Sequence, residues 1–477
     1  MQRRELAQSD GQAMRRLKQI SDLLHGVRIA RQLRSHDSWT REELARHQQR
    51  ELAGLVRHAV AQSRFYREHY SGLSFGDEID LQALPITNKR LLMDNFAAVV
   101  TDPRLKRDSL QEHLQGIQRD EFYLGEYRVV ATAGTSGLRG LFVYDRAAWR
   151  IVLANTIRWN RFAGITPTFP LRVRVCSIGA DNPMHVTQRI PESADVGLFK
   201  VLHLLATDPL PKLVDALNAF QPQVILPYPS VAALLAGEQI GGHLQIQPKV
   251  VATHSELLTA EMSRRIEAAW GIVPFNHYGL TEEPHVGFDC AEHHGVHILE
   301  DLSIVEVVDE NNQPVKPGVL GRKYLLTNLY NRVQPLIRYE VTDMLAKSAE
   351  LCPCGRPFPL VTQIGGRSED ILRLRDRQGH EVAIPPMALT LRIEALPGVA
   401  EYQADHDPSG IHLKIVPRAG TNRDELRAAL ADGIGTAIEA LGAVSPPVEV
   451  TFVDTVKRQQ QRMGKIKLIG ASGGPKP

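Results

Sequence analysis

Residues 250–278 read VVATHSELLTAEMSRRIEAAWGIVPFNHY, in which two short apolar segments flank a longer segment with helical spacing. We expect strands at 250–252 and 273–278 and a helix at 259–270 between them. The preceding residues repeat this alternation, with a helix ending near 220, a strand at 224–226 and a helix at 231–238. Strands that alternate with helices of this length predict an α/β fold, in which helices cover both faces of a mostly parallel sheet.

The chain is organised differently on either side of this region. Residues 1–110 are expected to form a helical lead-in, because apolar residues recur at helical spacing, and Thr87 is expected to cap one of its helices. Residues 298–345 favour antiparallel strands in a small barrel-like subdomain. After Gly366 the pattern predicts a hairpin at 371–384, helices at 387–395 and 423–441, and strands at 411–416 and 447–453. The sequence therefore predicts a large N-terminal domain over 1–366 and a smaller α+β domain over 367–477.

The composition argues against nucleic acid and against an anionic membrane as partners. The 477 residues include 56 basic and 54 acidic side chains, a formal net charge of only +2. No apolar run approaches the roughly 20 residues of a membrane-spanning helix, and the N-terminus lacks the apolar core of a signal peptide. Four cysteines in so long a chain do not make a disulfide framework, so we expect a cytoplasmic protein.

A loop rich in glycine and hydroxyl residues follows the strand expected near residue 130. It reads VATAGTSG over 130–137, and its backbone N–H groups can face a phosphate. The loop lacks the Lys-Ser/Thr ending of a P-loop, and by itself it would be interpreted as a plain turn. Four further motifs follow in order: HYGLTE at 277–282, RYEVTD at 338–343, GRSED at 366–370 and Gly464-Lys465. The order and spacing of the five motifs carry the signal.

This ordered set resembles the motif series of the adenylate-forming superfamily, which comprises acyl-CoA synthetases, peptide-synthetase adenylation domains and luciferases. The resemblance spans about residues 55 to 470. Three further segments are similar to the phenylacetate–CoA ligase branch: LPITNK at 84–89, GVHILED at 295–301 and CPCGR at 352–356. The resemblance implies that ATP activates a small-molecule carboxylic acid as acyl-AMP, with transfer to a thiol, most simply coenzyme A. It also implies that the small domain is a mobile lid, and a homodimer is expected from relatives.

The resemblance assigns roles to the motif residues of this chain. In the nucleotide site, phosphate contacts fall to Thr132, Gly134, Thr135, Ser136 and Gly137, and adenine and carboxylate contacts to Tyr278 and Gly279. Asp343 would accept from both ribose hydroxyls, and Arg367 would contact the ribose or phosphate. Thr281 would hydrogen-bond the α-phosphate, and Glu282 would hold Mg²⁺. Glu369 lies where the family has its hinge, and Lys465 would reach between the substrate carboxylate and the α-phosphate.

The chemistry explains why such residues are needed. A carboxylate that attacks a phosphate brings two anions together, so a cation and a metal must neutralise charge at the α-phosphorus. Each residue also has a simpler interpretation: Glu282 and Glu283 as a surface acidic pair, Asp343 as a turn residue, and Lys465 as one of several tail lysines. Taken together and in order, the motifs make the simpler interpretations improbable.

Three of the four cysteines and one histidine form a candidate metal site. The residues are Cys290, His297, Cys352 and Cys354, and a Cys₃His set is typical of structural zinc with all four positions filled. His293 is an alternative fourth ligand. The other interpretation is a set of free, buried thiols in a reducing cell.

The acid and its acceptor stay less defined. We expect the substrate pocket to include Tyr228, His254, Ser255, Glu256 and His277, which are polar or aromatic and suit an aryl or heteroaryl acid. Where relatives of the phenylacetate type have an Asn-Val-Phe-Pro run near the CoA site, this chain has HEVAIP at 380–385. An adenylyltransferase or amide synthetase, with an amine or hydroxyl acceptor, is therefore an alternative. A non-catalytic nucleotide-binding scaffold is a second alternative, against which the intact charged residues of the motifs argue.

Overall fold

The computed structural model describes residues 2–132, 139–167, 172–180, 182–384, 386–456 and 469–471. Its first part is helical, as expected. The helices are α1 (Gln2–His36), α2 (Arg41–Gln62), α3 (Arg64–His69), η1 (Leu81–Ala83), α4 (Lys89–Asp94), α5 (Phe96–Val99) and α6 (Arg107–Gly116). The predicted cap at Thr87 is wrong: Asn88 caps α4 by accepting a hydrogen bond from Leu91 N, whereas the Thr87 hydroxyl donates to Ile337 O.

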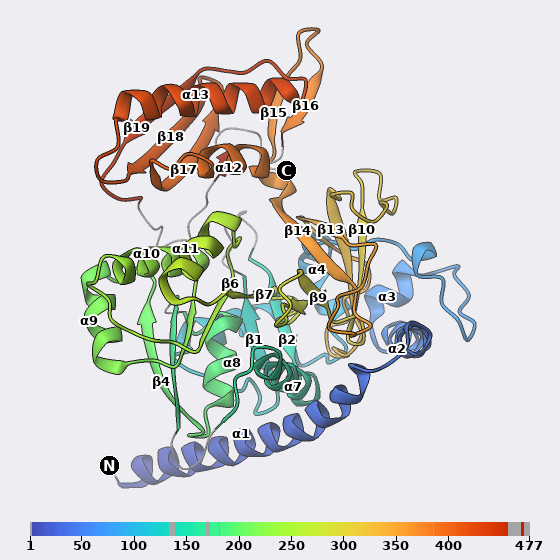
Figure 1. Ribbon diagram of the computed structural model, residues 1–477. Helices are drawn as coiled ribbons and strands as arrows, with labels where there is room; N and C mark the ends of the chain where they lie inside the picture. Colours follow the sequence, from blue (N-terminus) through green and yellow to red (C-terminus); the bar gives the residue numbers. More distant parts are fainter. Residues whose placement is uncertain are drawn as a thin grey trace.

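A nine-stranded sheet forms the centre of the molecule, in the order β13-β14-β9-β8-β7-β6-β5-β3-β4 (Figure 1). Five neighbouring strands are parallel: β3 (Val173–Gly179), β4 (Phe199–Leu205), β5 (Val224–Pro227), β6 (Val250–His254) and β7 (Phe275–Tyr278). Four antiparallel strands extend it: β8 (Gly287–Phe288), β9 (Val296–Ile298), β13 (Asp343–Lys347) and β14 (Leu360–Arg367). The sheet is therefore mixed. The parallel arrangement that we predicted is found only in the strands from β7 to β4.

Helices cover both faces of the parallel strands. These helices are α7 (Arg146–Phe162), α8 (Val186–Ala194), α9 (Leu210–Phe220), α10 (Pro229–Ile240) and α11 (Ala260–Trp270). Ile225 of β5 packs in a cluster with residues of α9 to α11, and its neighbour Val224 packs in a cluster with the end of α7. Because successive side chains of a strand point to opposite faces, this strand buries both of its faces.

Smaller antiparallel elements accompany the large sheet. Strands β1 (Arg128–Ala131) and β2 (Leu141–Tyr144) form a hairpin, and β10 (Ser303–Val308), β11 (Lys323–Asn328) and β12 (Tyr339–Val341) form a three-stranded sheet. The predicted antiparallel character of residues 298–345 is thus confirmed for these strands.

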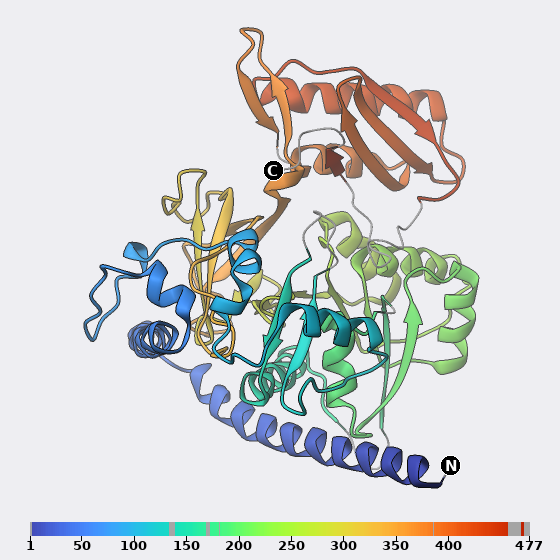
Figure 2. The same ribbon diagram turned by 180° about the vertical axis from the view of Figure 1, so that it is seen from behind.

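The C-terminal part lies beyond the end of β14 and packs around its own core (Figures 1 and 2). Its elements are η2 (Ser368–Asp370), β15 (Leu372–Arg375), β16 (Glu381–Ile384), α12 (Pro386–Glu394), β17 (Val399–Asp407), β18 (Gly410–Pro417), α13 (Arg423–Ala440), β19 (Val448–Phe452) and β20 (Ile469–Ala471). One hydrophobic cluster consists entirely of residues between Leu372 and Val450. Gly366 lies just before the predicted boundary, with φ of +85°, in the left-handed region that favours glycine.

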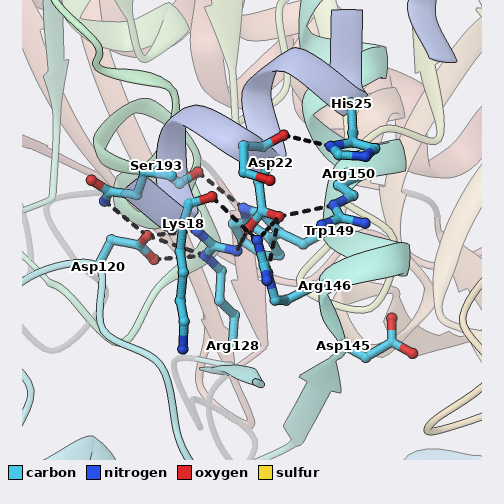
Figure 3. Close-up of polar contacts among 12 residues, drawn as sticks. Lys18, Asp22, His25, Asp120, Arg128, Asp145, Arg146, Trp149, Arg150 and Ser193 are labelled. Atoms are coloured by element: carbon cyan, nitrogen blue, oxygen red, sulfur yellow. Dashed lines mark hydrogen bonds and ion pairs between the residues drawn. The ribbon is translucent and has the colours of Figure 1, made fainter. Parts of the chain in front are cut away.

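Helix α1 crosses the molecule at the end opposite the C-terminal part and packs along α7 (Figures 1 and 2). Its Asp22 carboxylate is fully buried and pairs with three arginines, as Figure 3 shows: Arg128 at 3.4 Å, Arg146 at 2.8 Å and Arg150 at 2.9 Å. These ion pairs fix α1 to the start of β1 and to the outer face of α7. None of the described helices is long and apolar enough to cross a membrane.

Candidate active site

The β1–β2 hairpin carries the ends of the predicted phosphate loop. Gly140 N donates to Thr132 Oγ1 at 2.8 Å, and Thr132 N donates to Gly140 O at 3.0 Å, so the two ends of the loop lie next to each other. Four of the residues assigned to phosphate contacts, Gly134, Thr135, Ser136 and Gly137, lie outside the described residues.

Strand β2 also connects this hairpin to the HYGLTE motif. The hydroxyl of Tyr144, a fully buried residue of β2, lies 2.9 Å from Thr281 O and 2.8 Å from Glu282 O and donates to these carbonyls. The Tyr339 hydroxyl of β12 donates to Glu282 Oε1 at 3.0 Å. Two tyrosines thus hold the backbone and the carboxylate of the residues predicted to contact phosphate and metal.

Glu283 does not form a surface acidic pair with Glu282. Glu283 is fully buried, and its carboxylate accepts hydrogen bonds from Tyr330 Oη at 2.8 Å and from Asn328 Nδ2. Burial raises the pKa of Glu283 to about 8. Glu282 is 8% exposed, so this simpler interpretation of the pair is wrong.

Three residues assigned to the nucleotide lie together. Tyr278 Oη donates to Asp343 Oδ2 at 2.6 Å, and Arg367 Nε lies 3.3 Å from Asp343 Oδ1. The Tyr324 hydroxyl lies 2.9 Å from that of Tyr278. Burial and the Asp343 carboxylate raise the pKa of Tyr278 well above its usual value, so Tyr278 stays a donor. A Cβ on Gly279 would lie 2.0 Å from Pro284 O, so the turn after Tyr278 requires glycine.

The predicted pocket residues follow the carboxyl ends of neighbouring parallel strands, where ligands bind in α/β sheets. The rings of Tyr228, after β5, and His254, at the end of β6, lie 5.5 Å apart. Glu256 Oε2 accepts a hydrogen bond of 2.5 Å from Ser230 Oγ, and Ser255 Oγ lies 2.9 Å from His254 Nδ1.

His277, in β7, extends the pocket group. Its Nε2 lies 2.9 Å from Nδ1 of His285, a residue absent from the predicted set. Burial lowers the pKa of His277 well below its usual value and that of His285 to about 3. Both imidazoles are therefore neutral near pH 7, and this side of the pocket is polar without being charged.

The candidate metal residues form one cluster, with all four ligand atoms within 4.8 Å of one another. Cys290 Sγ lies 3.7 Å from Cys352 Sγ and 3.3 Å from His297 Nε2, which lies 3.5 Å from Cys354 Sγ. Zinc–sulfur bonds of about 2.3 Å and zinc–nitrogen bonds of about 2.0 Å in a tetrahedron separate neighbouring ligand atoms by roughly 3.5–3.8 Å. The alternative ligand His293 instead pairs with Asp289 at 2.7 Å. The residues present therefore fit a tetrahedral metal ion.

Two predicted residues cannot be compared with this geometry. Lys465 lies outside the described residues, and the backbone of Glu369 is in η2, directly after β14, while its side chain is not described. Sequence reasoning assigned no role to Tyr144, Tyr324 or Tyr339, although Tyr339 belongs to the RYEVTD motif, because tyrosines in strands ordinarily indicate core packing. The nearest signal in the sequence was the HYGLTE motif, because Tyr144 donates to the backbone carbonyls of its Thr281 and Glu282.

Comparisons with known proteins place this geometry in context. No family model matches the chain. A phenylacetate–coenzyme A ligase from Thermus thermophilus is 26% identical over 372 residues, which cover 74% of this chain and 76% of the relative. A crystal structure of 2-hydroxyisobutyryl-CoA ligase in the post-adenylation state with R3-HIB-AMP superposes with a TM-score of 0.71 at 19% identity, covering 92% of this chain and 91% of that chain. An open conformation of the same ligase with 2-HIB-AMP and CoA gives 0.61 at 20% identity, covering 92% and 93%. These structures share the fold of this chain.

Proposed function

We propose that this chain, an acid–thiol ligase of the AMP-forming kind and a member of the adenylate-forming superfamily, activates an aryl or heteroaryl carboxylic acid as acyl-AMP and transfers the acyl group to coenzyme A. The observation that carries the proposal is the set of hydrogen bonds that holds the HYGLTE motif: Tyr144 Oη donates to Thr281 O and Glu282 O, and Tyr278 Oη donates to Asp343 Oδ2. We propose that Thr281 is the donor for phosphate and Asp343 the carboxylate for ribose. The 26% identity to a phenylacetate–coenzyme A ligase supports coenzyme A as the acceptor.

In the first step, an oxygen of the substrate carboxylate attacks the α-phosphorus of ATP, and the bond to the bridging oxygen of pyrophosphate breaks. Thr281 donates to the α-phosphate, and the fixed Asp343 carboxylate accepts from the ribose hydroxyls. The Glu282 carboxylate, held by Tyr339, is the oxygen ligand that Mg²⁺ prefers, and bound Mg²⁺ would neutralise phosphate charge. Lys465 supplies a compact cation between the two reacting anions.

In the second step, the thiol attacks the acyl carbon and AMP leaves. We propose that the small domain over 367–477 rotates about Glu369, three residues after Gly366. This rotation withdraws Lys465 from the reacting groups and opens the path by which the thiol enters. The left-handed φ of Gly366 marks a position where backbone rotation meets no Cβ. A lysine placed on such a lid can leave after the adenylate has formed.

We assign the Cys290, His297, Cys352 and Cys354 cluster to a structural zinc ion. The cluster ties the turn after β8 and strand β9 to the turn between β13 and β14, some 60 residues later. With four protein ligands no position is open for a substrate, so the ion would stabilise the fold. None of the four cysteines, all of which are described, forms a disulfide, which supports our proposal of a cytoplasmic location.

The test is acid-dependent exchange of pyrophosphate into ATP over a panel of aryl and alkyl carboxylic acids, with Lys465→Ala as the control. We expect exchange with aryl acids that disappears in Lys465→Ala, and AMP release that depends on coenzyme A. Release that requires an amine would favour the amide synthetase. A protein that binds ATP but exchanges pyrophosphate with no acid would refute the function proposed here and would favour the scaffold.

A further inference from the structure

Helix α7 presents two chemically different faces. Arg146 and Arg150 lie on the outer face and pair with Asp22 of α1 (Figure 3). At 100° per residue, Val152, Asn155, Thr156 and Trp159 fall within an arc of about 100° on the other side of the helix. These four side chains are uncharged, and three of them carry hydrogen-bonding groups.

The contacts of two of these residues show where this inner face points. Thr156 Oγ1 lies 3.0 Å from His285 Nε2, and the ring of Trp159 lies 5.5 Å from that of His277. His277 precedes Tyr278 at the carboxyl end of β7, within the pocket group described above. The inner face of α7 therefore lies against the two neutral histidines, of which His277 is the strand partner of His254 at the end of β6.

Two side chains of this face have polar atoms without partners. Asn155 is fully buried, and among the described residues neither its Oδ1 nor its Nδ2 has a hydrogen-bond partner. In the same part of the structure, Nε1 of Trp159, a residue 8% exposed, is also without one. Leaving a buried amide unpaired is unfavourable, so these atoms indicate an occupant with matching groups.

We infer that the acid activated by this chain carries a neutral hydrogen-bonding group, such as an aromatic hydroxyl or a ring nitrogen, that is bound by Asn155 and Trp159. The inference rests on the function proposed above and narrows its substrate class. Trp159 Nε1 can only donate, so the group must contain an acceptor atom, whereas Asn155 can both donate and accept. A second carboxylate or an ammonium group on the acid would find no opposite charge among Asn155, Thr156, Trp159 and the neutral histidines.

The test compares kcat/KM for pyrophosphate exchange between acids of matched size. The probes are benzoic and phenylacetic acid, their ring-hydroxylated counterparts, and the pyridine analogues of both. We expect the best hydroxylated or pyridine acid to exceed its hydrocarbon parent by at least about tenfold, because a site built to bind a polar group discriminates against an analogue that lacks it. Parents that match or exceed their polar counterparts would overturn the inference while leaving acyl-adenylate formation intact.

Variants assign the preference to these residues. Asn155→Leu keeps the branched shape of the side chain without its polar atoms and is expected to lower the ratio of polar to parent acid toward one, as is Trp159→Phe, which keeps an aromatic ring. Asn160→Leu makes the same change on the same helix, outside the inner face, and should leave the ratio unaltered. Thermal melting identifies variants that fail to fold. If one of the two inner-face variants fails to fold, the other is sufficient for the test. A ratio unchanged in a folded variant would overturn the inference, whereas exchange with no acid in the unaltered chain would remove the proposed function and the inference together.

Discussion

Replacing Tyr144 with phenylalanine tests whether the β1–β2 hairpin positions the HYGLTE motif. The substitution removes one oxygen atom and leaves the ring in place against Trp149, whose ring lies 5.6 Å away in an edge-to-face arrangement. Burial and the neighbouring Glu283 and Glu282 carboxylates raise the pKa of Tyr144 well above its usual value, so its hydroxyl is a donor throughout the physiological range. The change therefore removes a hydrogen bond and no charge.

The magnitude follows from the two carbonyls that share this donor. The hydroxyl has one proton for Thr281 O at 2.9 Å and Glu282 O at 2.8 Å, so the loss amounts to about one buried hydrogen bond, or roughly 1–3 kcal/mol. If half of a 3 kcal/mol loss, about 1.5 kcal/mol, falls on the alignment of Thr281 and Glu282, kcat/KM decreases about tenfold. The remainder lowers the free energy of unfolding.

The assay is pyrophosphate exchange across a range of Mg²⁺ concentrations, together with unfolding in urea. Tyr70→Phe is the matched control, because Tyr70 is 2% exposed and its hydroxyl has no hydrogen-bond partner among the described residues. We expect Tyr70→Phe to change neither quantity appreciably, and Tyr144→Phe to need more Mg²⁺ for half-maximal exchange. If Tyr144→Phe loses stability but exchanges pyrophosphate at the original rate and Mg²⁺ concentration, the hydroxyl only supports folding and the positioning argument is wrong.

Three further predictions concern stability and metal binding. Asp22→Asn leaves three arginines without their shared carboxylate and should lower the free energy of unfolding in urea by about 3 kcal/mol. The control Asp77→Asn, in an exposed ion pair with Arg57, should lower the free energy of unfolding by under about 1 kcal/mol. The pKa of Glu283 is raised from 4.5 to about 8, so its buried carboxyl stabilises the fold most below pH 4.5, and this contribution is lost as the pH rises to 8. Glu283→Gln should therefore gain stability relative to the original chain over that interval, by up to about 1.4 kcal/mol per pH unit, and a constant difference would contradict the buried titration. Cys290→Ser should lower both the melting temperature and the zinc content measured by mass spectrometry. Cys176 is a buried cysteine outside the cluster, so Cys176→Ser should leave the zinc content unchanged. Equal zinc content in the two variants would refute the site.

The parts of the fold that the sequence predicted are those with a strong local pattern. The strands at 224–226 and 250–252 are confirmed in β5 and β6, and the hairpin at 371–384 is confirmed in β15 and β16, since apolar runs bounded by turn residues need no distant partner to be recognised. Strands β8 and β9 have two and three residues, too few for any periodicity, and they turn the large sheet from parallel to mixed. The domain limits at 366 and 367 stay a prediction.

The candidate site divides in the same way. Residues within motifs, such as Glu282 and Asp343, could be proposed from sequence because their neighbours identify them, and their roles stay predictions. Thr87 was assigned the wrong role because Thr87 and Asn88 are adjacent and both can cap a helix. The Thr87 hydroxyl instead bonds to Ile337 O, 250 residues away, and a contact so distant in sequence could not be predicted. Asn155 and Trp159 belong to no motif, and their unpaired atoms are visible only once the burial of the inner face of α7 is known.

The tyrosines Tyr278 and Tyr339 show how uncharged groups position the carboxylates of the site. Tyr278 donates to Asp343 and Tyr339 donates to Glu282, and burial raises the pKa of both phenols well above its usual value. A phenol that stays protonated fixes a carboxylate without neutralising it, whereas an arginine in its place would cancel the charge that a metal ion requires. Arg367 does pair with Asp343, but about half of its side chain is exposed, so water screens its charge. The buried hydroxyls therefore hold the Glu282 and Asp343 side chains in place without adding a positive charge beside them.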